Sequence, residues 1–385
     1  MAFRFDTPLT LCTITDDGKK IYTYFCDGNI VELPTRWLHA VSCQPRYSGE
    51  TVRQYGANTK DFLRWLLDGK RYPALSLDTI LKVVTRKDVE DWIKDRKAAS
   101  LGASTLRNRE VAVKMLFDWL TTEDGGKVRT IENTPYKTGK LISPPPAGRK
   151  PRFVTVEDVI GLLNGYYNES ERCLIHTLYD TGIRISEAAR LRKCDLPNQR
   201  DFADGLKYYP LYVRGSKGRG GQTKERVALI SSPVVARIRR YHNNPEYRFS
   251  PFFDHSSPEK PAFLSTNGYY LSSRNVGKQM GNAAARAGLE PERFSPHKLR
   301  HGAAFSLLTS ELGKDYLDKL FLVQQLFGHN QITTTEVYTA IPPAVLAKLN
   351  SDRIFVDKYQ EAKRIKDATY LPYEKHNERR GHRKW

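Results

Sequence analysis

The chain has 385 residues, of which 62 are Lys or Arg and 43 are Asp or Glu, so its formal net charge is +19 and its pI is about 9.6. This length is sufficient for two domains, and the positive charge indicates a polyanionic partner, because each cation that contacts a phosphate releases condensed counterions. The five Cys form no Cys-x-x-Cys pair and no run of about 18 apolar residues occurs, which argues against a disulfide scaffold, a zinc site and a membrane-spanning helix.

Residues 1–47 are predicted to form a small β-rich segment. The stretches LTLCTIT, IYTYFC and IVEL alternate in polarity or are rich in β-formers, and Asp17-Gly18 and Asp27-Gly28-Asn29 supply turns between them. We therefore expect three short strands, which are either a separate module or a cap on the next domain.

Residues 48–136 show helical periodicity and are predicted to form a helical domain. One helix covers about 51–67, a second begins after Thr85 with Asp88 as its capping-box partner, and a third begins near Ser104. The third helix carries three cations that are either a solvated face or contacts to a phosphate backbone: Arg107, Arg109 and Lys114.

Residues 137–153, KTGKLISPPPAGRKPRF, are predicted to be a basic linker between domains. Three consecutive prolines cannot continue a helix and favour extended chain. The charge, which includes Arg149 and Lys150, would suit a segment that lies across a DNA backbone.

Residues 154–345 are predicted to form a second domain, followed by a tail over 346–385 that is helical at first and then basic. Thr155 and Asp158 are placed like a capping box, and an apolar helix is stopped by Gly182. Two strands then surround a Gly-rich basic loop in KYYPLYVRGSKGRGGQTKERVALI.

Four segments of this second domain concentrate the reactive side chains. TGIRISEAARL places Arg184 at the start of a helix after Gly182, and the loop between the two strands carries Lys217. In SPHKLRHGAAFSLL, Ser295 can cap a helix, Pro296 suits its first position, and His297 and Arg300 share one face.

The fourth segment is LFGHNQITTTEVYTAI, in which Gly328 ends a helix and His329 follows on the connection. A new helix is predicted to begin at Thr333 and to carry Tyr338. His297 and His301 stand four apart, but the sequence suggests no third ligand nearby, so we expect no metal and no other cofactor.

An Arg, a hairpin Lys, H-x-x-R, G-H and a Tyr nine residues after that His, in this order, resemble the tyrosine site-specific recombinase or phage integrase family. The resemblance implies a multidomain fold, mainly α with small β-sheets, that joins a helical core-binding domain of SAM-like type to an α+β catalytic domain. It also implies DNA strand cleavage and rejoining without metal or ATP, through a 3′-phosphotyrosyl intermediate at Tyr338.

The chemistry of phosphodiester cleavage agrees with these residue types. Arg184 and Arg300 would neutralise two phosphate oxygens, because a guanidinium donates two hydrogen bonds and keeps its charge. A tyrosine is a poor nucleophile while protonated, so His297 is the candidate base for Tyr338. His329 would donate a hydrogen bond to a phosphate oxygen.

The remaining roles rest on the resemblance. It makes Lys217 the acid that protonates the departing 5′ oxygen, and Glu187 the group that orients Arg184. The hairpin loop, GSKGRGGQTKER, is longer than the common family pattern, so Lys224 is the alternative acid. Lys298 and Gly302 also differ from the Asp and the hydroxyl residue that the family often has.

The resemblance implies double-stranded DNA as partner and a homotetramer around two duplexes, with accessory DNA-bending proteins as further partners. We expect a cytoplasmic, nucleoid-associated protein without a membrane partner, and the tail would dock on a neighbouring protomer or be disordered. The N-terminal strands would bind arm-type DNA sites or cap the helical domain.

Three other functions remain to be weighed. A type IB topoisomerase and a telomere resolvase use the same chemistry for other products. A non-catalytic DNA-binding relative would need none of the catalytic residue types.

Overall fold

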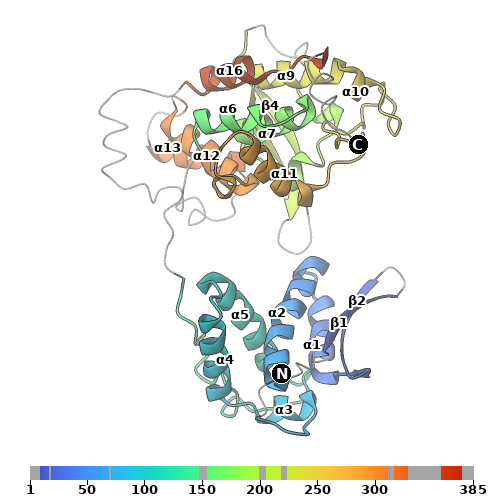
Figure 1. Ribbon diagram of the computed structural model, residues 1–385, viewed down its shortest axis with the longest axis vertical. Coiled ribbons are helices and arrows are strands. Elements are labelled where there is room, and N and C mark those ends of the chain that lie inside the picture. Colours follow the sequence, from blue (N-terminus) through green and yellow to red (C-terminus); the bar gives the residue numbers. More distant parts are fainter. Residues whose placement is uncertain are drawn as a thin grey trace. The chain divides into compact units, whose positions relative to one another are not determined.

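The computed structural model describes residues 9–16, 19–68, 71–146, 154–198, 205–217, 223–310, 312, 316–327 and 357–374. The chain divides into two compact units at Gly148–Arg149, here called the N-terminal and the C-terminal unit (Figure 1). Both are mainly helical with one small antiparallel sheet each among the described residues, as predicted.

The N-terminal unit contains a three-stranded sheet, which packs against α1 and α2, and five helices. The strands are β1 (Thr10–Asp16), β2 (Lys19–Cys26) and β3 (Asn29–Ile30), in the order β1-β2-β3. The helices are α1 (Glu32–Ser42), α2 (Gly49–Asp68), α3 (Leu77–Val83), α4 (Arg86–Ala98) and α5 (Ala103–Trp119). Leu9 and Tyr24 of the sheet region lie in the same apolar cluster as Phe62 and Trp92 of the helices, so the sheet is part of one core.

The predicted third strand is present but shorter than IVEL, because β3 ends at Ile30 and α1, which the sequence did not predict, begins at Glu32 within the segment expected to be β-rich. The carboxylate of Asp78 accepts hydrogen bonds from the backbone N–H groups of Glu32 (2.9 Å) and Leu33 (2.8 Å). It thereby satisfies donors that a helix start leaves open. This cap comes from another helix, so the local sequence does not reveal it.

The first part of the predicted linker packs on the N-terminal unit. Glu110 of α5 is fully buried and accepts hydrogen bonds from the backbone N–H groups of Ile142 and Ser143. Arg107 donates to the carbonyl of Ser143 at 2.6 Å. Residues 142 and 143 are therefore held by α5, although they belong to no helix or strand.

The C-terminal unit surrounds α7 and a β-hairpin with helices (Figure 1). Its elements are α6 (Val156–Asn164), α7 (Glu169–Thr181), α8 (Ile185–Ala188), β4 (Tyr208–Lys217), β5 (Thr223–Ser231), α9 (Ser232–Asn243), α10 (Pro245–Arg248), α11 (Ser273–Arg286), α12 (Pro296–Thr309), α13 (Tyr316–Phe327) and α16 (Lys358–Thr369). Nearly every residue of α7 is buried, so this helix forms the centre of the core.

The helix starts predicted at Thr85, Thr155 and Ser295 are confirmed. Thr85 with Asp88, and Thr155 with Asp158, form complete capping boxes. The hydroxyl of Ser295 accepts from the backbone N–H of Lys298, and Pro296 begins α12. All of these contacts lie within three residues, which explains why the sequence predicts them.

Helix α16 is the main described part of the predicted tail, and it packs against α6, α7 and α9 of its own chain (Figure 1). Lys358 donates to the carbonyl of Asp180 at 2.5 Å, and Ser306 donates to Glu361 at 2.6 Å. At the other end of the helix, fully buried Arg237 binds both Glu169 and Thr369.

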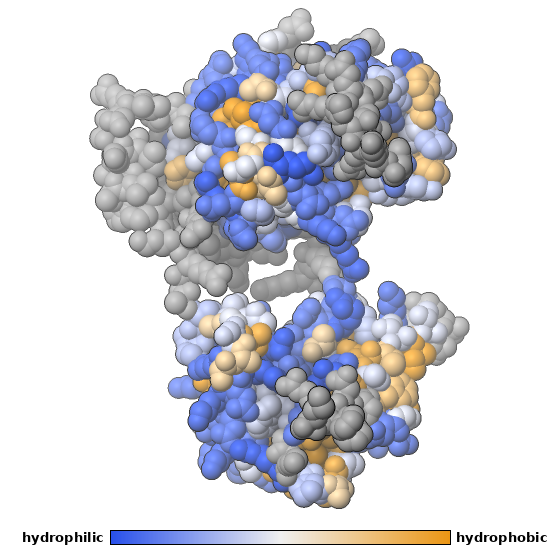
Figure 2. Space-filling model, in the orientation of Figure 1, coloured by the Kyte–Doolittle hydropathy of each residue, from blue (hydrophilic) through white to orange (hydrophobic). Residues whose placement is uncertain are grey.

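The face of the molecule shown in Figure 2 is mostly hydrophilic in both units. No helix within the described ranges is long and apolar enough to span a bilayer.

Candidate active site

Arg184 is the N-cap residue of α8, directly after the turn that ends α7, and its orientation is set by Glu187. The Glu187 carboxylate accepts from the backbone N–H of Arg184 at 2.7 Å and from its Nη1 at 3.1 Å. The Glu187 side chain is fully buried, whereas that of Arg184 is 34% exposed. A fixed carboxylate therefore presents a guanidinium that solvent can still reach.

Arg300 lies one turn after His297 on α12 and is almost fully buried. Its Nη1 donates to the carbonyl of Gly182 at 2.5 Å and its Nη2 to the carbonyl of Phe327 at 2.6 Å. Gly182 stands two residues before Arg184, and Phe327 stands directly before Gly328 and His329. One guanidinium thus joins three of the four segments that the sequence singles out.

His297 is exposed at the start of the same helix. The next histidine on this face, His301, is half-buried, and burial together with the charges of His297 and Arg300 lowers its pKa. The start of α12 therefore carries the Arg300 guanidinium and two imidazoles, side chains that can donate hydrogen bonds to a phosphate.

The hairpin β4–β5, which carries the remaining segment around Lys217, is joined to the same place by a residue that sequence reasoning missed, Arg226. Its Nη2 donates to Glu187 at 2.7 Å, and its Nη1 donates to the carbonyl of Leu326 at 2.5 Å. Burial lowers the pKa of Arg226, although Glu187 raises it. The KER sequence after the basic loop contained this residue, but a single Arg in a strand indicates no partner.

The backbones of Lys217 and Lys224 lie near the tip of the hairpin, where Lys217 pairs with Thr223 and Lys224 pairs with Ser216. Their side chains lie outside the described part of the structure. His329, Tyr338 and the helix predicted from Thr333 also fall outside it, as do Arg149 and Lys150. Their roles stay predictions.

The three cations of α5 have partners inside the N-terminal unit. Arg107 binds the carbonyl of Ser143, Arg109 pairs with Asp61 at 2.7 Å, and Lys114 pairs with Asp118 at 2.5 Å. Pairing does not prevent a phosphate contact, so their role in DNA binding also stays a prediction. Within the described residues no group of three or more His, Cys, Asp or Glu could hold a metal ion.

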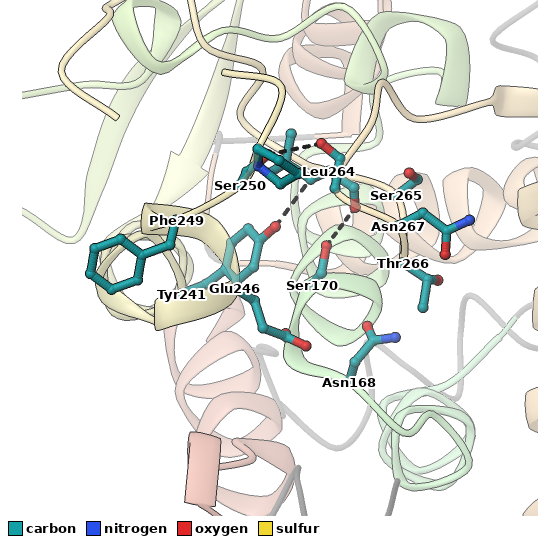
Figure 3. Close-up of a pocket in the computed structure, with 12 residues that line it drawn as sticks. Asn168, Ser170, Tyr241, Glu246, Phe249, Ser250, Leu264, Ser265, Thr266 and Asn267 are labelled. Carbon is teal, nitrogen blue, oxygen red and sulfur yellow. Dashed lines mark hydrogen bonds between the residues drawn. The ribbon is translucent and has the colours of Figure 1, made fainter. Parts of the chain in front are cut away.

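A separate cavity of about 210 Å³ lies beside α7, α9 and α10 (Figure 3). The hydroxyl of Ser170 donates to the carbonyl of Leu264 at 2.8 Å, and the Leu264 N–H approaches the Tyr241 hydroxyl at 3.4 Å. The residues around it include hydroxyl and amide groups and the carboxylate of Glu246, but no Lys or Arg. This lining does not suit a phosphate backbone.

Comparisons with known proteins agree with the arrangement. Residues 154–344 match the model of the phage integrase family, and residues 35–124 match that of the phage integrase N-terminal SAM-like domain. The chain is 26% identical to the tyrosine recombinase XerD of Rickettsia bellii over 299 residues, which cover 74% of this chain and 89% of the relative. It is also 26% identical to the tyrosine recombinase XerC of Bradyrhizobium diazoefficiens over 325 residues, covering 82% and 91%.

Solved structures show the same fold. The Tn1549 transposon integrase in complex with transposon right end DNA matches with a TM-score of 0.57 and 17% identity, covering 84% of this chain and 99% of that one. The XerH site-specific recombinase bound to its palindromic difH substrate matches with a TM-score of 0.56 and 18% identity, covering 78% and 79%. The chain therefore belongs to the phage integrase family of tyrosine recombinases, enzymes that break and rejoin DNA strands in site-specific recombination.

Proposed function

We propose that Tyr338 is the nucleophile of this recombinase and that Arg184 and Arg300 hold the phosphate it attacks. The observation that carries the proposal is the junction at Arg300, which brings the segments of Arg184, of His297 and of the chain entering His329 and Tyr338 to one place. Three separate parts of the sequence that contain the reactive residue types converge there.

The chemical step follows from these assignments. The Tyr338 oxygen attacks the scissile phosphorus and passes its proton to His297, while the bond from phosphorus to the 5′ oxygen breaks. That oxygen takes a proton from Lys217, with Lys224 as the alternative donor. His329 donates a hydrogen bond to a phosphate oxygen, and the two guanidiniums neutralise the charge that develops there.

The product is a 3′-phosphotyrosyl bond and a free 5′ hydroxyl. A 5′ hydroxyl from a partner duplex reverses the step and restores the phosphodiester, so neither ATP nor a metal takes part. The phosphotyrosyl linkage retains the energy of the broken bond.

Double-stranded DNA is the partner, and it is supported by the DNA complexes in which the similar integrase and XerH structures were solved. We expect a homotetramer on two duplexes, with accessory DNA-bending proteins as further partners and with action on DNA inside the cell. The basic linker residues Arg149 and Lys150 are our candidates for contacts with the DNA backbone.

Covalent trapping tests the nucleophile. Purified protein would be incubated with nicked suicide duplexes from the DNA that flanks its own gene, in the presence of EDTA. We expect an SDS-resistant protein–DNA adduct with wild type and none with Tyr338→Phe, because the variant lacks the attacking oxygen.

The control is binding of both proteins to the same duplex. Tight binding of a verified site without any wild-type adduct would overturn the assignment and favour the non-catalytic relative. Relaxed circles without recombinant product would instead favour a type IB topoisomerase, and hairpin ends would favour a telomere resolvase.

A further inference from the structure

Arg226 lies on the inner face of the hairpin that carries the proposed acid. It pairs with Val213 across the hairpin and lies on the same face of β5 as Ala228 and Ile230, which are fully buried. Val227, on the opposite face, is 53% exposed. Because successive side chains of a strand point to opposite faces, Arg226 extends toward the core of the unit. Its side chain is only 9% exposed.

The two hydrogen bonds of Arg226 connect elements that hold different catalytic residues. Nη2 donates to the same Glu187 oxygen, Oε2, that accepts the backbone N–H of Arg184. Nη1 donates to Leu326 in the last turn of α13. A shift of the Arg226 guanidinium would therefore change the positions of both Arg184 and the end of α13.

The end of α13 is held by two guanidiniums on neighbouring carbonyls. Arg226 binds Leu326 from β5, and Arg300 binds Phe327 from α12. The C-terminal carbonyls of a helix lack partners inside the helix and carry partial negative charge, so cations stabilise them. Gly328 follows immediately, so these bonds fix the point at which the chain enters the segment of His329 and Tyr338.

We propose that Arg226 is a positioning residue for strand cleavage. It holds the Glu187 carboxylate, which orients Arg184, in a fixed position relative to the end of α13, which leads to Tyr338. The proposal rests on the proposed function, since it acts through the residues assigned there. It predicts that loss of Arg226 slows the chemical step more than it weakens DNA binding.

Arg214 provides a matched control on the other strand of the hairpin. It is also ion-paired, with Asp195 at 2.7 Å, and its side chain is 32% exposed. Its other contacts are with Cys194 and Glu259, which lie in none of the four segments. Replacing Arg214 removes a hairpin guanidinium of similar kind without touching the link at Glu187 and Leu326.

The experiment compares Arg226→Met and Arg226→Lys with Arg214→Met and Arg214→Lys. Thermal melting, the Kd for the suicide duplex and the single-turnover rate of adduct formation would be measured for each full-length protein. We expect adduct formation by Arg226→Met to be slower by about 100-fold, the size of effect that small misplacement of reacting groups produces. The Kd should stay within about threefold of wild type.

Arg226→Lys should be slowed less, by about 10-fold, because it keeps a charge beside Glu187 but lacks the planar fork that spans the carboxylate and the carbonyl. It also serves as the test if Arg226→Met fails to fold. The Arg214 variants should form adduct within about threefold of the wild-type rate. The double variant with Arg226→Met and Glu187→Gln should form adduct only slightly more slowly than the slower single variant, because both changes break the same Arg226–Glu187 contact.

Tyr338→Phe and wild type accompany every series. Wild-type adduct together with near-wild-type rates for both Arg226 variants would overturn this proposal alone. Rates that fall only in proportion to DNA affinity or to melting temperature would also overturn it, in favour of a DNA contact or a purely structural ion pair. A wild type that forms no adduct on a verified site would overturn the proposed function and this proposal with it.

Discussion

Gly182 connects backbone conformation with packing at the site. Its φ of +63° lies in the left-handed region, and a Cβ placed there would come within 2.2 Å of the Phe327 ring. Its carbonyl accepts from Arg300. The residue that ends α7 therefore also determines how closely the end of α13 approaches Arg300.

We expect Gly182→Ala to lower the free energy of unfolding of the C-terminal unit by about 2–5 kcal/mol, from left-handed strain of about 1–2 kcal/mol and overpacking of about 1–3 kcal/mol. Gly288→Ala is the control, since its φ is +71° but nothing lies within 4 Å of the added Cβ. Gly288→Ala should lower the free energy of unfolding only by the backbone strain of about 1–2 kcal/mol. Urea denaturation measures both, and equal losses would contradict the close approach of Phe327.

Gly302 accounts for one departure from the family pattern. A Cβ at this position would lie 2.7 Å from the carbonyl oxygen of Val154 and 2.9 Å from the ring of Tyr179. The hydroxyl side chain that the family often has here would not fit between α12 and these neighbours. Lys298 donates to the carbonyl of Glu292, so its ammonium is used locally.

At the scale of an element, α16 is attached to the C-terminal unit by a buried ion pair. Arg237 binds Glu169 at 2.5 Å and the Thr369 hydroxyl at 2.8 Å, and both charged side chains are essentially inaccessible to solvent. Glu169 also accepts from the backbone N–H of Leu371 at 3.0 Å. The arginine thus joins α9, α7 and the end of α16.

Arg237→Met should destabilise the C-terminal unit by about 3–5 kcal/mol, because it leaves the buried carboxylate of Glu169 without its counterion. Adding Glu169→Gln should recover part of the loss, and circular dichroism in urea measures both. Four of the five tryptophans lie in the N-terminal unit, so the transition seen by tryptophan fluorescence should stay in place. A double variant no more stable than Arg237→Met would contradict the pairing.

The separation along the chain between two residues in contact decides whether the sequence could predict that contact. The capping boxes at Thr85 and Thr155 are complete within four residues, and the sequence predicted both helix starts. The cap of α1 comes from Asp78, and Arg226 finds its partner at Leu326, 100 residues away. Patterns along the chain carry no information about such partners, so neither α1 nor the role of Arg226 was predicted.

For the whole molecule, charge predicted the class of partner but not the contacts. The net charge of +19 agrees with a DNA enzyme, yet Arg107, Arg109 and Lys114 bind groups of their own unit. The family motifs were recognisable because the order of four segments is a property of the sequence. Which cations meet the phosphate backbone depends on how DNA docks, and no pattern along the chain records that.

We expect DNA binding to depend steeply on salt. If the enzyme neutralises about 6–10 phosphates, its Kd should rise by at least about 10³-fold between 50 and 200 mM salt. Fluorescence anisotropy with a labelled cognate duplex measures this, and Tyr338→Phe should give the same slope because it changes no charge near neutral pH. A rise of less than about tenfold would contradict a phosphate interface of that size.

If Tyr338 forms the proposed phosphotyrosyl bond, the attachment of α16 also affects what happens to the joined DNA. Residues 328–356, which include Tyr338, connect two anchored points, the end of α13 at Phe327 and the start of α16 at Lys358. A single proteolytic cut before Tyr338 would place Tyr338 and its DNA on the C-terminal fragment, which α16 would keep bound to the rest of the protein. A cut after Tyr338 would leave Tyr338 and its DNA covalently attached to the N-terminal fragment. A nicked enzyme would therefore keep hold of its DNA in native buffer and, when cut before Tyr338, release it only when α16 is melted away.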